Sequence, residues 1–134
     1  MRYAMSEEKK LSRREEREEI IKRLYEMDIN QEYSFLDTDS EFINESLHGV
    51  IDHIEELDDI IVKNLSNWKI GRLSFVDRGI IRFATFEILL TNTPPEIAIN
   101  EALNLTRKFS DEGNGKMVGF TNKVLDNITK YLKK

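Results

Sequence analysis

Apolar residues recur along most of this chain at the three- and four-residue spacing of an α-helix. In the first such segment, Ile20, Leu24 and Met27 fall on one face. Ser12 is placed to cap the start of this helix, and Glu15 three residues later completes a capping-box pattern. No window alternates apolar and polar residues cleanly over five positions, as a half-buried strand would. The pattern therefore predicts an all-α fold.

Five more helices are expected after the first. Residues 31–40 are predicted to form a loop held on the core by Tyr33, Phe35 and Leu36, and the acidic residues between 55 and 59 to mark a break. Ser74 and Asp77 form a second capping pattern before a segment that is apolar nearly all round and belongs at the centre. Thr93 is expected to cap the next helix, with a proline in its first turn. The predicted ranges are 42–54, 57–65, 75–90, 94–109 and 118–132.

Composition places these helices in one domain. The 134 residues include 40% hydrophobic residues, enough for one compact core. There is no cysteine, which fits a reducing compartment, and residues 1–10 lack the apolar core of a signal peptide. We therefore expect a cytoplasmic protein with an N-terminal extension over residues 1–11 and one helical domain over residues 12–134. No stretch is apolar enough to suggest a membrane span.

The first predicted helix has an unusual distribution of charge. The net charge is −5, so any nucleic-acid site must be a local basic patch. Arg13, Arg14 and Arg17 lie on the same stripe as the apolar residues that follow them, while Glu18 is expected to point elsewhere. Tyr25 lies in line with Arg14. If these arginines project beyond the core, they form a cationic strip ending at an aromatic ring, which suits single-stranded RNA. The alternative is a solvated helix with paired charges.

Other candidate chemistry is weaker. Arg78 at the start of the central helix could meet a phosphate, and Arg82 and Glu87 are expected to form an internal salt bridge. The Gly-rich segment 113–116 lacks the spacing of a phosphate-binding loop, and residue 117 is Met. His48 and His53 are five residues apart and are expected at the surface or its boundary, not on a metal.

Several segments resemble the NusB transcription antitermination family. The matching motifs are the arginine-rich start and Leu24-Tyr25 of the first helix, LSFVDRGIIRFATFEIL at 73–89, PPEIAINEA at 94–102 continuing to Phe109, and FTNKVLD at 120–126. The resemblance covers residues 12–130, with Met117, Val118 and Gly119 as three apparent extra residues before the last motif.

The resemblance implies six to seven helices in two packed subdomains, roughly 12–70 and 71–134, and a protein that is not an enzyme and needs no cofactor. It implies binding of boxA-type RNA in rRNA leader transcripts together with the ribosomal small-subunit protein NusE. This would take place within the RNA polymerase antitermination complex and promote processive rRNA transcription, and a weak homodimer is also compatible. The RNA-contacting positions carried over are Arg13, Arg14, Arg17, Tyr25, Asp77, Arg78 and Phe120, of which Asp77 and Phe120 come from the resemblance only.

Two alternatives remain open from the sequence. One is a protein-interaction module with a charged, solvated helix. The other is a NusB-like accessory domain of an rRNA cytosine methyltransferase, which would need an additional cofactor-binding domain.

Overall fold

The computed structural model describes residues 10–66 and 69–134, so most of the predicted N-terminal extension lies outside the described residues. Within them the chain forms α-helices and one short 3₁₀-helix, with no β-strand, which confirms the predicted all-α class. The elements are α1 (Arg13–Asn30), α2 (Glu41–Asp52), α3 (Ile54–Lys63), η2 (Ile70–Arg72), α4 (Phe75–Leu90), α5 (Pro95–Phe109) and α6 (Lys116–Tyr131).

Helix α1 begins where the capping pattern predicts. The Ser12 hydroxyl accepts a hydrogen bond from the Glu15 backbone N–H at 3.1 Å, and the Glu15 carboxylate accepts one from the Ser12 N–H at 2.8 Å. Two of the N–H groups that a helix start leaves without partners are thereby satisfied. At the other end the backbone turns left-handed at Gln31, whose φ is 53°, and the helix stops.

The break between α2 and α3 lies at His53, not among the acidic residues 55–59 as predicted. His53 ends α2 and begins α3, and its ring Nδ1 lies 2.9 Å from the Gly49 carbonyl oxygen. Glu55 and Glu56 occupy the first turn of α3, where the positive end of the helix dipole favours carboxylates. The acidic residues therefore mark the start of a helix.

The start of α5 also differs from the prediction. Pro94 is the residue before the helix and Pro95 is its first residue, a position where the missing N–H of proline costs nothing. Thr93 does not cap this helix, because its hydroxyl is engaged with the hydroxyl of Thr91 at 2.9 Å and donates to Glu87 at 3.3 Å. The predicted cap is thus used to close the turn after α4.

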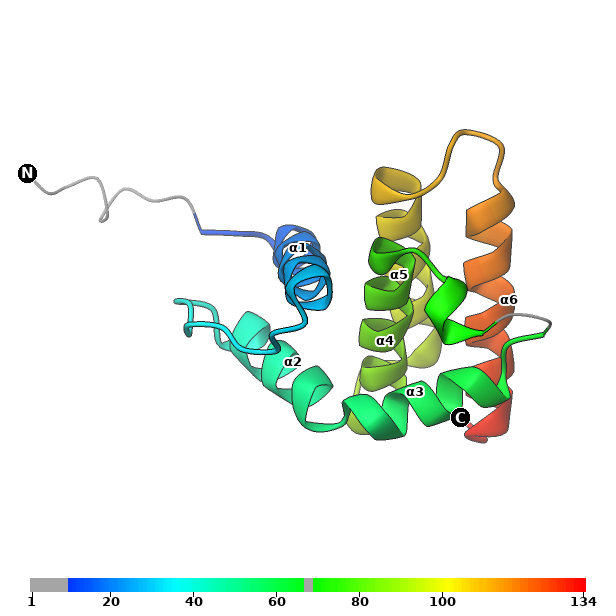
Figure 1. Cartoon of the computed structure of the whole chain (residues 1–134), viewed down its shortest axis with the longest axis horizontal. Coiled ribbons are helices and arrows are strands. Elements are labelled where there is room, and N and C mark those ends of the chain that lie inside the picture. Colours follow the sequence, from blue (N-terminus) through cyan, green and yellow to red (C-terminus); the bar gives the residue numbers. More distant parts are fainter. Residues whose placement is uncertain (1–9, 67–68) are drawn as a thin grey trace, which may run out of the picture.

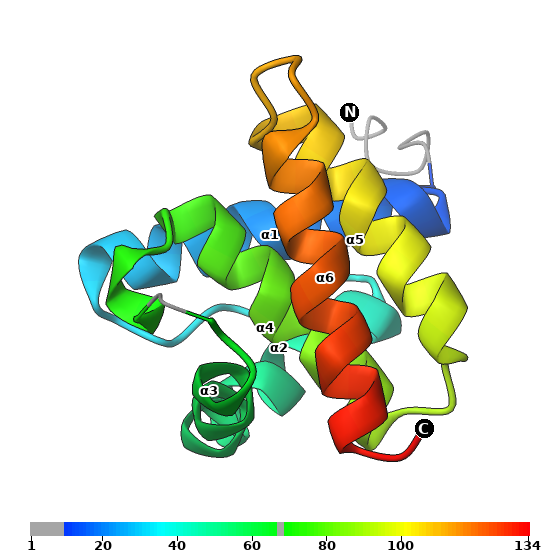
Figure 2. The same ribbon diagram turned by 90° about the vertical axis from the view of Figure 1, so that its right-hand side faces the viewer.

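Helix α4 is the centre of the fold. It contacts α1, α2, α3, α5 and α6, and it stands between α1 and α2 on one side and α6 on the other (Figure 1). The view turned by 90° shows α6 crossing in front of α4 (Figure 2). Buried residues from both halves of the chain join one hydrophobic cluster that includes Leu47, Phe83 and Leu125. This position explains why α4 has apolar residues on nearly every side.

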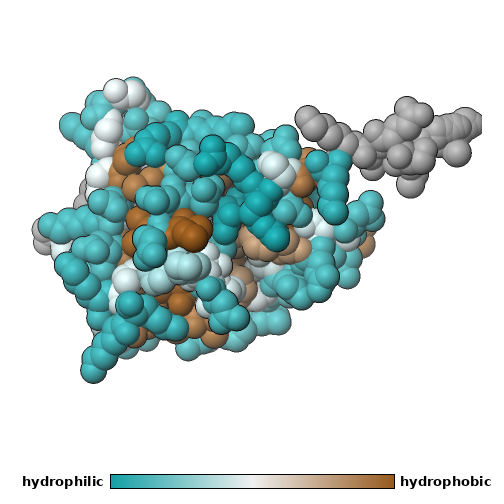
Figure 3. All heavy atoms as spheres, turned by 180° about the vertical axis from the view of Figure 1, so that it is seen from behind, coloured by the Kyte–Doolittle hydropathy of each residue, from teal (hydrophilic) through white to brown (hydrophobic). Residues whose placement is uncertain are grey.

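The loop over residues 31–40 is held as predicted by two of its three large side chains. Tyr33 and Phe35 pack against the core, whereas Leu36 is 88% exposed, so its predicted anchoring role is wrong. Among the helices of the described segments, none has the length and apolar character to cross a membrane. The face opposite to that of Figure 1 is largely hydrophilic, with small apolar patches between polar side chains (Figure 3).

Close packing between α2 and α4 gives a test of this arrangement. A Cβ added to Gly49 would overlap the Phe86 ring, whereas a Cβ on Gly119 in α6 would meet no neighbour within 4 Å. We expect Gly49→Ala to lower the free energy of unfolding by about 1–3 kcal/mol through overpacking. Gly119→Ala should raise it by roughly 0.5–1 kcal/mol through helix propensity. Urea unfolding of both variants measures the contrast, and a neutral Gly49→Ala would contradict the close approach of the Phe86 ring.

Candidate nucleic-acid interface

Two of the three predicted arginines of α1 are exposed and lean toward opposite neighbours. The Arg13 side chain is 56% exposed and lies beside Phe42 of α2, with its guanidinium carbon 3.9 Å from the ring centroid. The Arg14 side chain is 62% exposed and reaches Glu101 of α5 at 3.5 Å. The start of α1 thus offers one accessible guanidinium on each side.

Arg17 does not project into water as predicted. It is buried, and its guanidinium donates two hydrogen bonds to the Glu87 carboxylate of α4, at 2.7 and 3.3 Å. Arg17 lies on the apolar face of α1, which packs against the core. Its side chain is therefore buried, and Glu87 compensates its charge. The prediction that all three arginines form one cationic strip in solvent is therefore wrong for Arg17.

Acidic residues also accompany the exposed arginines. Glu16 lies 3.2 Å from the Arg13 guanidinium. Glu18 does not point away but pairs with Lys108 of α5 at 3.0 Å. The surface around the start of α1 therefore carries both acidic and basic side chains, whereas the helical pattern predicted a purely basic strip.

The predicted pair of Arg82 with Glu87 is replaced by two pairs between helices. Arg82 donates two hydrogen bonds to Asp58 of α3, both 2.7 Å long, and also lies 3.5 Å from Asp28 at the end of α1. Glu87 is paired with Arg17. The two residues are five positions apart in α4 and therefore face different neighbours. Arg82 and Glu87 are therefore both in ion pairs, as predicted, but each pairs with a residue of another helix and not with the other.

Arg78, predicted to meet phosphate, is engaged inside the protein. Its side chain is only 13% exposed and donates a hydrogen bond of 2.7 Å to Asp28. Burial alone would raise the pKa of the Asp28 carboxyl, but hydrogen bonds from Arg78 and Tyr33 and the charges of Arg78 and Arg82 outweigh it and lower this pKa. Arg78 thus already has a buried carboxylate as its counter-ion.

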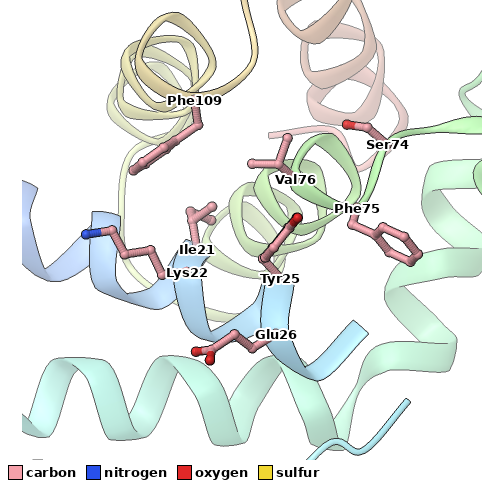
Figure 4. A pocket seen from close by; sticks show the side chains of 8 residues that line it. All are labelled: Ile21, Lys22, Tyr25, Glu26, Ser74, Phe75, Val76 and Phe109. Atoms are coloured by element: carbon pink, nitrogen blue, oxygen red, sulfur yellow. The ribbon is translucent and has the colours of Figure 1, made fainter. Parts of the chain in front are cut away.

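Tyr25 lies at a large apolar groove between α1, α4 and α5. The groove has a volume of about 740 Å³, and Figure 4 shows Ile21, Val76 and Phe109 approaching it from three helices. Tyr25 is 42% exposed and meets the ring of Phe75 edge to face, with centroids 6.4 Å apart. Lys22 and Glu26 are the charged members of the lining, with opposite signs.

Asp77 and Phe120, distant in sequence, come together at a smaller hollow. Its volume is about 120 Å³, and Ser74 lines both this hollow and the groove beside Tyr25. Asp77 is buried, and its Oδ1 has no hydrogen-bond partner among the described residues. The apparent extra residues 117–119 form the first turn of α6, which places Met117 one turn before Phe120 in the same lining.

The predicted site residues therefore fall into two groups. Arg13 and Arg14 lie at the start of α1. Tyr25, toward the end of α1, lies near the hollow lined by Asp77 and Phe120, because Ser74 lines both that hollow and the groove beside Tyr25. Arg14 and Tyr25 are eleven positions apart, which corresponds to about 16 Å of helix. Arg107 and Lys108 at the end of α5 border a hollow of about 310 Å³ together with Arg14. Sequence reasoning missed these two cations and the rings of Phe42 and Phe75. Their helical spacing could not reveal them, because their proximity to α1 depends on how the helices cross.

His48 and His53 lie where the sequence predicts. His48 is exposed beside Asp37, at 3.2 Å, and His53 is partly buried at the junction of α2 and α3. No group of three or more potential metal-ligating side chains gathers anywhere in the described segments.

The buried pair of Arg17 and Glu87 gives a stability prediction. Arg17→Ala should lower the free energy of unfolding by about 3–5 kcal/mol, because it leaves the Glu87 charge buried without its partner. Arg23→Ala, which breaks a half-exposed pair with Glu19 in the same helix, should cost about 0.5 kcal/mol. Urea unfolding at neutral pH compares them. Equal effects would contradict the buried pair, and the double variant Arg17→Met, Glu87→Leu should recover much of the loss.

Asp28 gives a prediction about pH. Its lowered pKa means that the ionised carboxylate stabilises the folded state above the unfolded-state pKa of about 4, and that this contribution disappears as the pH falls through the folded-state value. Asp28→Asn should therefore be destabilising at pH 7 and lose most of that disadvantage in acid. Asp126→Asn, in an exposed pair with Lys130, is the control and should change little. Urea unfolding of both variants from pH 7 to below about pH 4 tests this prediction. An effect of Asp28→Asn that does not change with pH would contradict it.

Comparison with known proteins identifies the family of this chain. The NusB family model matches residues 2–130. The transcription antitermination protein NusB of Staphylococcus aureus strain MRSA252 is 41% identical over 132 residues, covering 90% of this chain and 100% of that protein.

Solved structures show the same fold. The structure of T. maritima NusB has a TM-score of 0.77 and 29% identity, covering 91% of this chain and 93% of that chain. A chain from the crystal structure of antitermination factors NusB and NusE in complex with dsRNA has a TM-score of 0.75 and 28% identity, covering 89% and 96%. Since the family model and a relative above 40% identity both extend over nearly the whole sequence, the chain belongs to the NusB family.

Proposed function

We propose that this chain is a transcription antitermination factor that binds boxA-type RNA in rRNA leader transcripts together with NusE and so promotes processive rRNA transcription. Its relatives include antitermination proteins, and one structural neighbour is a complex with NusE and dsRNA. The observation that carries the RNA role is the pair of exposed guanidinium groups, Arg13 and Arg14, at the start of α1. On a chain of net charge −5, such a local cluster is the kind of feature that an RNA backbone requires.

The three arginines then have different tasks. Arg13 and Arg14 would contact RNA directly. Arg17 would act from inside, because its pair with Glu87 holds α1 against α4 and so sets the direction in which its two neighbours leave the helix. Arg78, paired with Asp28, would support the end of α1 in the same way.

The residues at the groove beside Tyr25 and at the smaller hollow would bind a base and the protein partner. The half-exposed ring of Tyr25 and the side chain of Phe120 offer aromatic surfaces for bases. The Asp77 Oδ1, which lacks a partner among the described residues, would accept a hydrogen bond from an N–H group at the hollow. The floor of the larger groove is predominantly apolar, so it suits side chains of NusE better than phosphates.

This role requires recognition and no bond-making step, so we infer that the chain acts as a cytoplasmic, non-catalytic subunit. Its contribution would be to present RNA and NusE to the transcription complex. Because direct contacts with phosphates dominate the affinity of proteins for nucleic acids, binding should weaken strongly as salt is raised.

The RNA role predicts a salt-dependent loss in defined variants. Arg14→Ala should reduce the slope of log affinity against log salt by about 0.7, the value for one phosphate contact on single-stranded RNA. The double variant Arg13→Ala, Arg14→Ala should lower affinity for a boxA-like RNA, with NusE present, by at least about tenfold. Fluorescence anisotropy titrations at several salt concentrations measure both effects.

A charge-matched control removes two cations elsewhere. Lys63 in α3 and Lys130 in α6 are exposed and pair with acids four positions away in their own helices. The double variant Lys63→Ala, Lys130→Ala should keep the affinity of the wild type. If the arginine double variant binds as the wild type does, or if both double variants lose affinity equally, the proposed interface is wrong.

A further inference from the structure

Arg13 is held in a way that differs from Arg14. Its guanidinium carbon lies 3.9 Å from the centroid of the Phe42 ring, which is van der Waals contact for a planar cation over an aromatic face. Phe42 is fixed in turn, because it is partly buried and meets Phe83 of α4 edge to face, with centroids 6.4 Å apart. The Arg13 guanidinium therefore lies over a ring that is itself packed against the core.

The edge of the same guanidinium is also engaged. Glu16 accepts a hydrogen bond from Arg13 Nη1 at 3.2 Å, and Glu16 also accepts one from the hydroxyl of Ser40, the residue that caps α2. Part of the donor fork that would grip a phosphate is thus already used, and its charge is partly compensated. Despite these contacts the side chain is 56% exposed, which leaves surface for a ligand.

We propose that the outer face of the Arg13 guanidinium is a stacking site for a nucleobase, with Phe42 as the ring that supports it from beneath. This inference rests on the proposed function and deepens it, since it assigns a base contact to Arg13 and leaves the phosphate contact to Arg14. Planar guanidinium groups stack on bases in recognition of single-stranded RNA, and a guanidinium already positioned on a ring loses little conformational freedom when the base arrives.

The geometry also indicates the course of the strand. Arg13 leans toward α2 and Arg14 toward α5, so an RNA strand that uses both must cross the start of α1. A base would then lie on the α2 side while a backbone phosphate lies on the α5 side.

The first test replaces the plane but keeps the charge. Arg13→Lys should weaken binding of a boxA-like RNA by about tenfold, within the range for losing one stacked base, while leaving the salt slope unchanged. Arg23→Lys is the matched control and should bind as the wild type does, because Arg23 pairs with Glu19 in the same helix and lies outside the proposed interface. An unchanged affinity for Arg13→Lys, or a changed salt slope, would overturn the stacking site.

The second test identifies the base by a thermodynamic cycle. RNAs with a single abasic nucleotide at successive positions are titrated against the wild type and Arg13→Lys. At one position the abasic change should cost the wild type about tenfold but cost Arg13→Lys little, since the stacking partner is already absent. Additive losses at every position would overturn the proposal.

Variants of Phe42 test the support beneath Arg13. Phe42→Tyr keeps a ring and should preserve affinity, whereas Phe42→Leu removes it and should reproduce the loss seen with Arg13→Lys. Urea unfolding establishes that Phe42→Leu is folded at the assay temperature, and the Arg13→Lys cycle stands without it. Equal affinity of the Phe42→Tyr and Phe42→Leu variants would contradict the supporting role of the ring.

Control titrations separate the stacking site from the proposed function. If the wild type binds no boxA-like RNA even with NusE, the proposed function fails and the stacking site with it. If the wild type binds but Arg13→Lys binds equally well, only the stacking site fails. If Arg13→Lys weakens NusE binding to the same extent without RNA, Arg13 contacts the protein partner and the inference is overturned.

Discussion

Two charges buried in the central helix, Arg82 and Glu87, are compensated by ion pairs with neighbouring helices, and this requirement determines how those helices pack. Glu87 of α4 is matched by Arg17 of α1, and Arg82 of α4 is matched by Asp58 of α3. Asp28, at the end of α1, accepts a hydrogen bond from Arg78. An ion pair removed from water is tolerated only when both partners and their hydrogen bonds are in place. Apolar contacts alone would allow several positions of the helices around α4, whereas the ion pairs require specific ones, because their hydrogen bonds are directional.

The same requirement shapes the surface of α1. Because Arg17 points inward to Glu87, the side chains of Arg13 and Arg14 extend from α1 on either side of it. Arg13 then lies over Phe42, and Arg14 reaches Glu101. An inward-facing arginine thus organises two outward-facing ones. A surface of this kind is preorganised, which under the proposed function would reduce the conformational entropy lost when a flexible RNA strand binds.

The two ends of α1 differ in chemistry. Its start carries cations with acidic neighbours, suited to a polyanion whose contacts weaken in salt. Its end borders an apolar groove with Tyr25 and Phe75, suited to bases or to the side chains of a protein. One rigid helix therefore joins a polar surface to an apolar one, and both are positioned by α4. Under the proposed function, this helix would link the RNA to the protein partner.

The sequence alone determined the helical class, the capping of α1 and α4 and the central place of α4, because capping and periodicity act between residues close in the chain. It also marked Arg13, Arg14 and Tyr25 as residues of interest. Only the tertiary structure decided that Arg17 is buried and that Phe42 supports Arg13. A helical pattern shows which face a residue occupies, but the charge or ring it meets there is supplied by another helix.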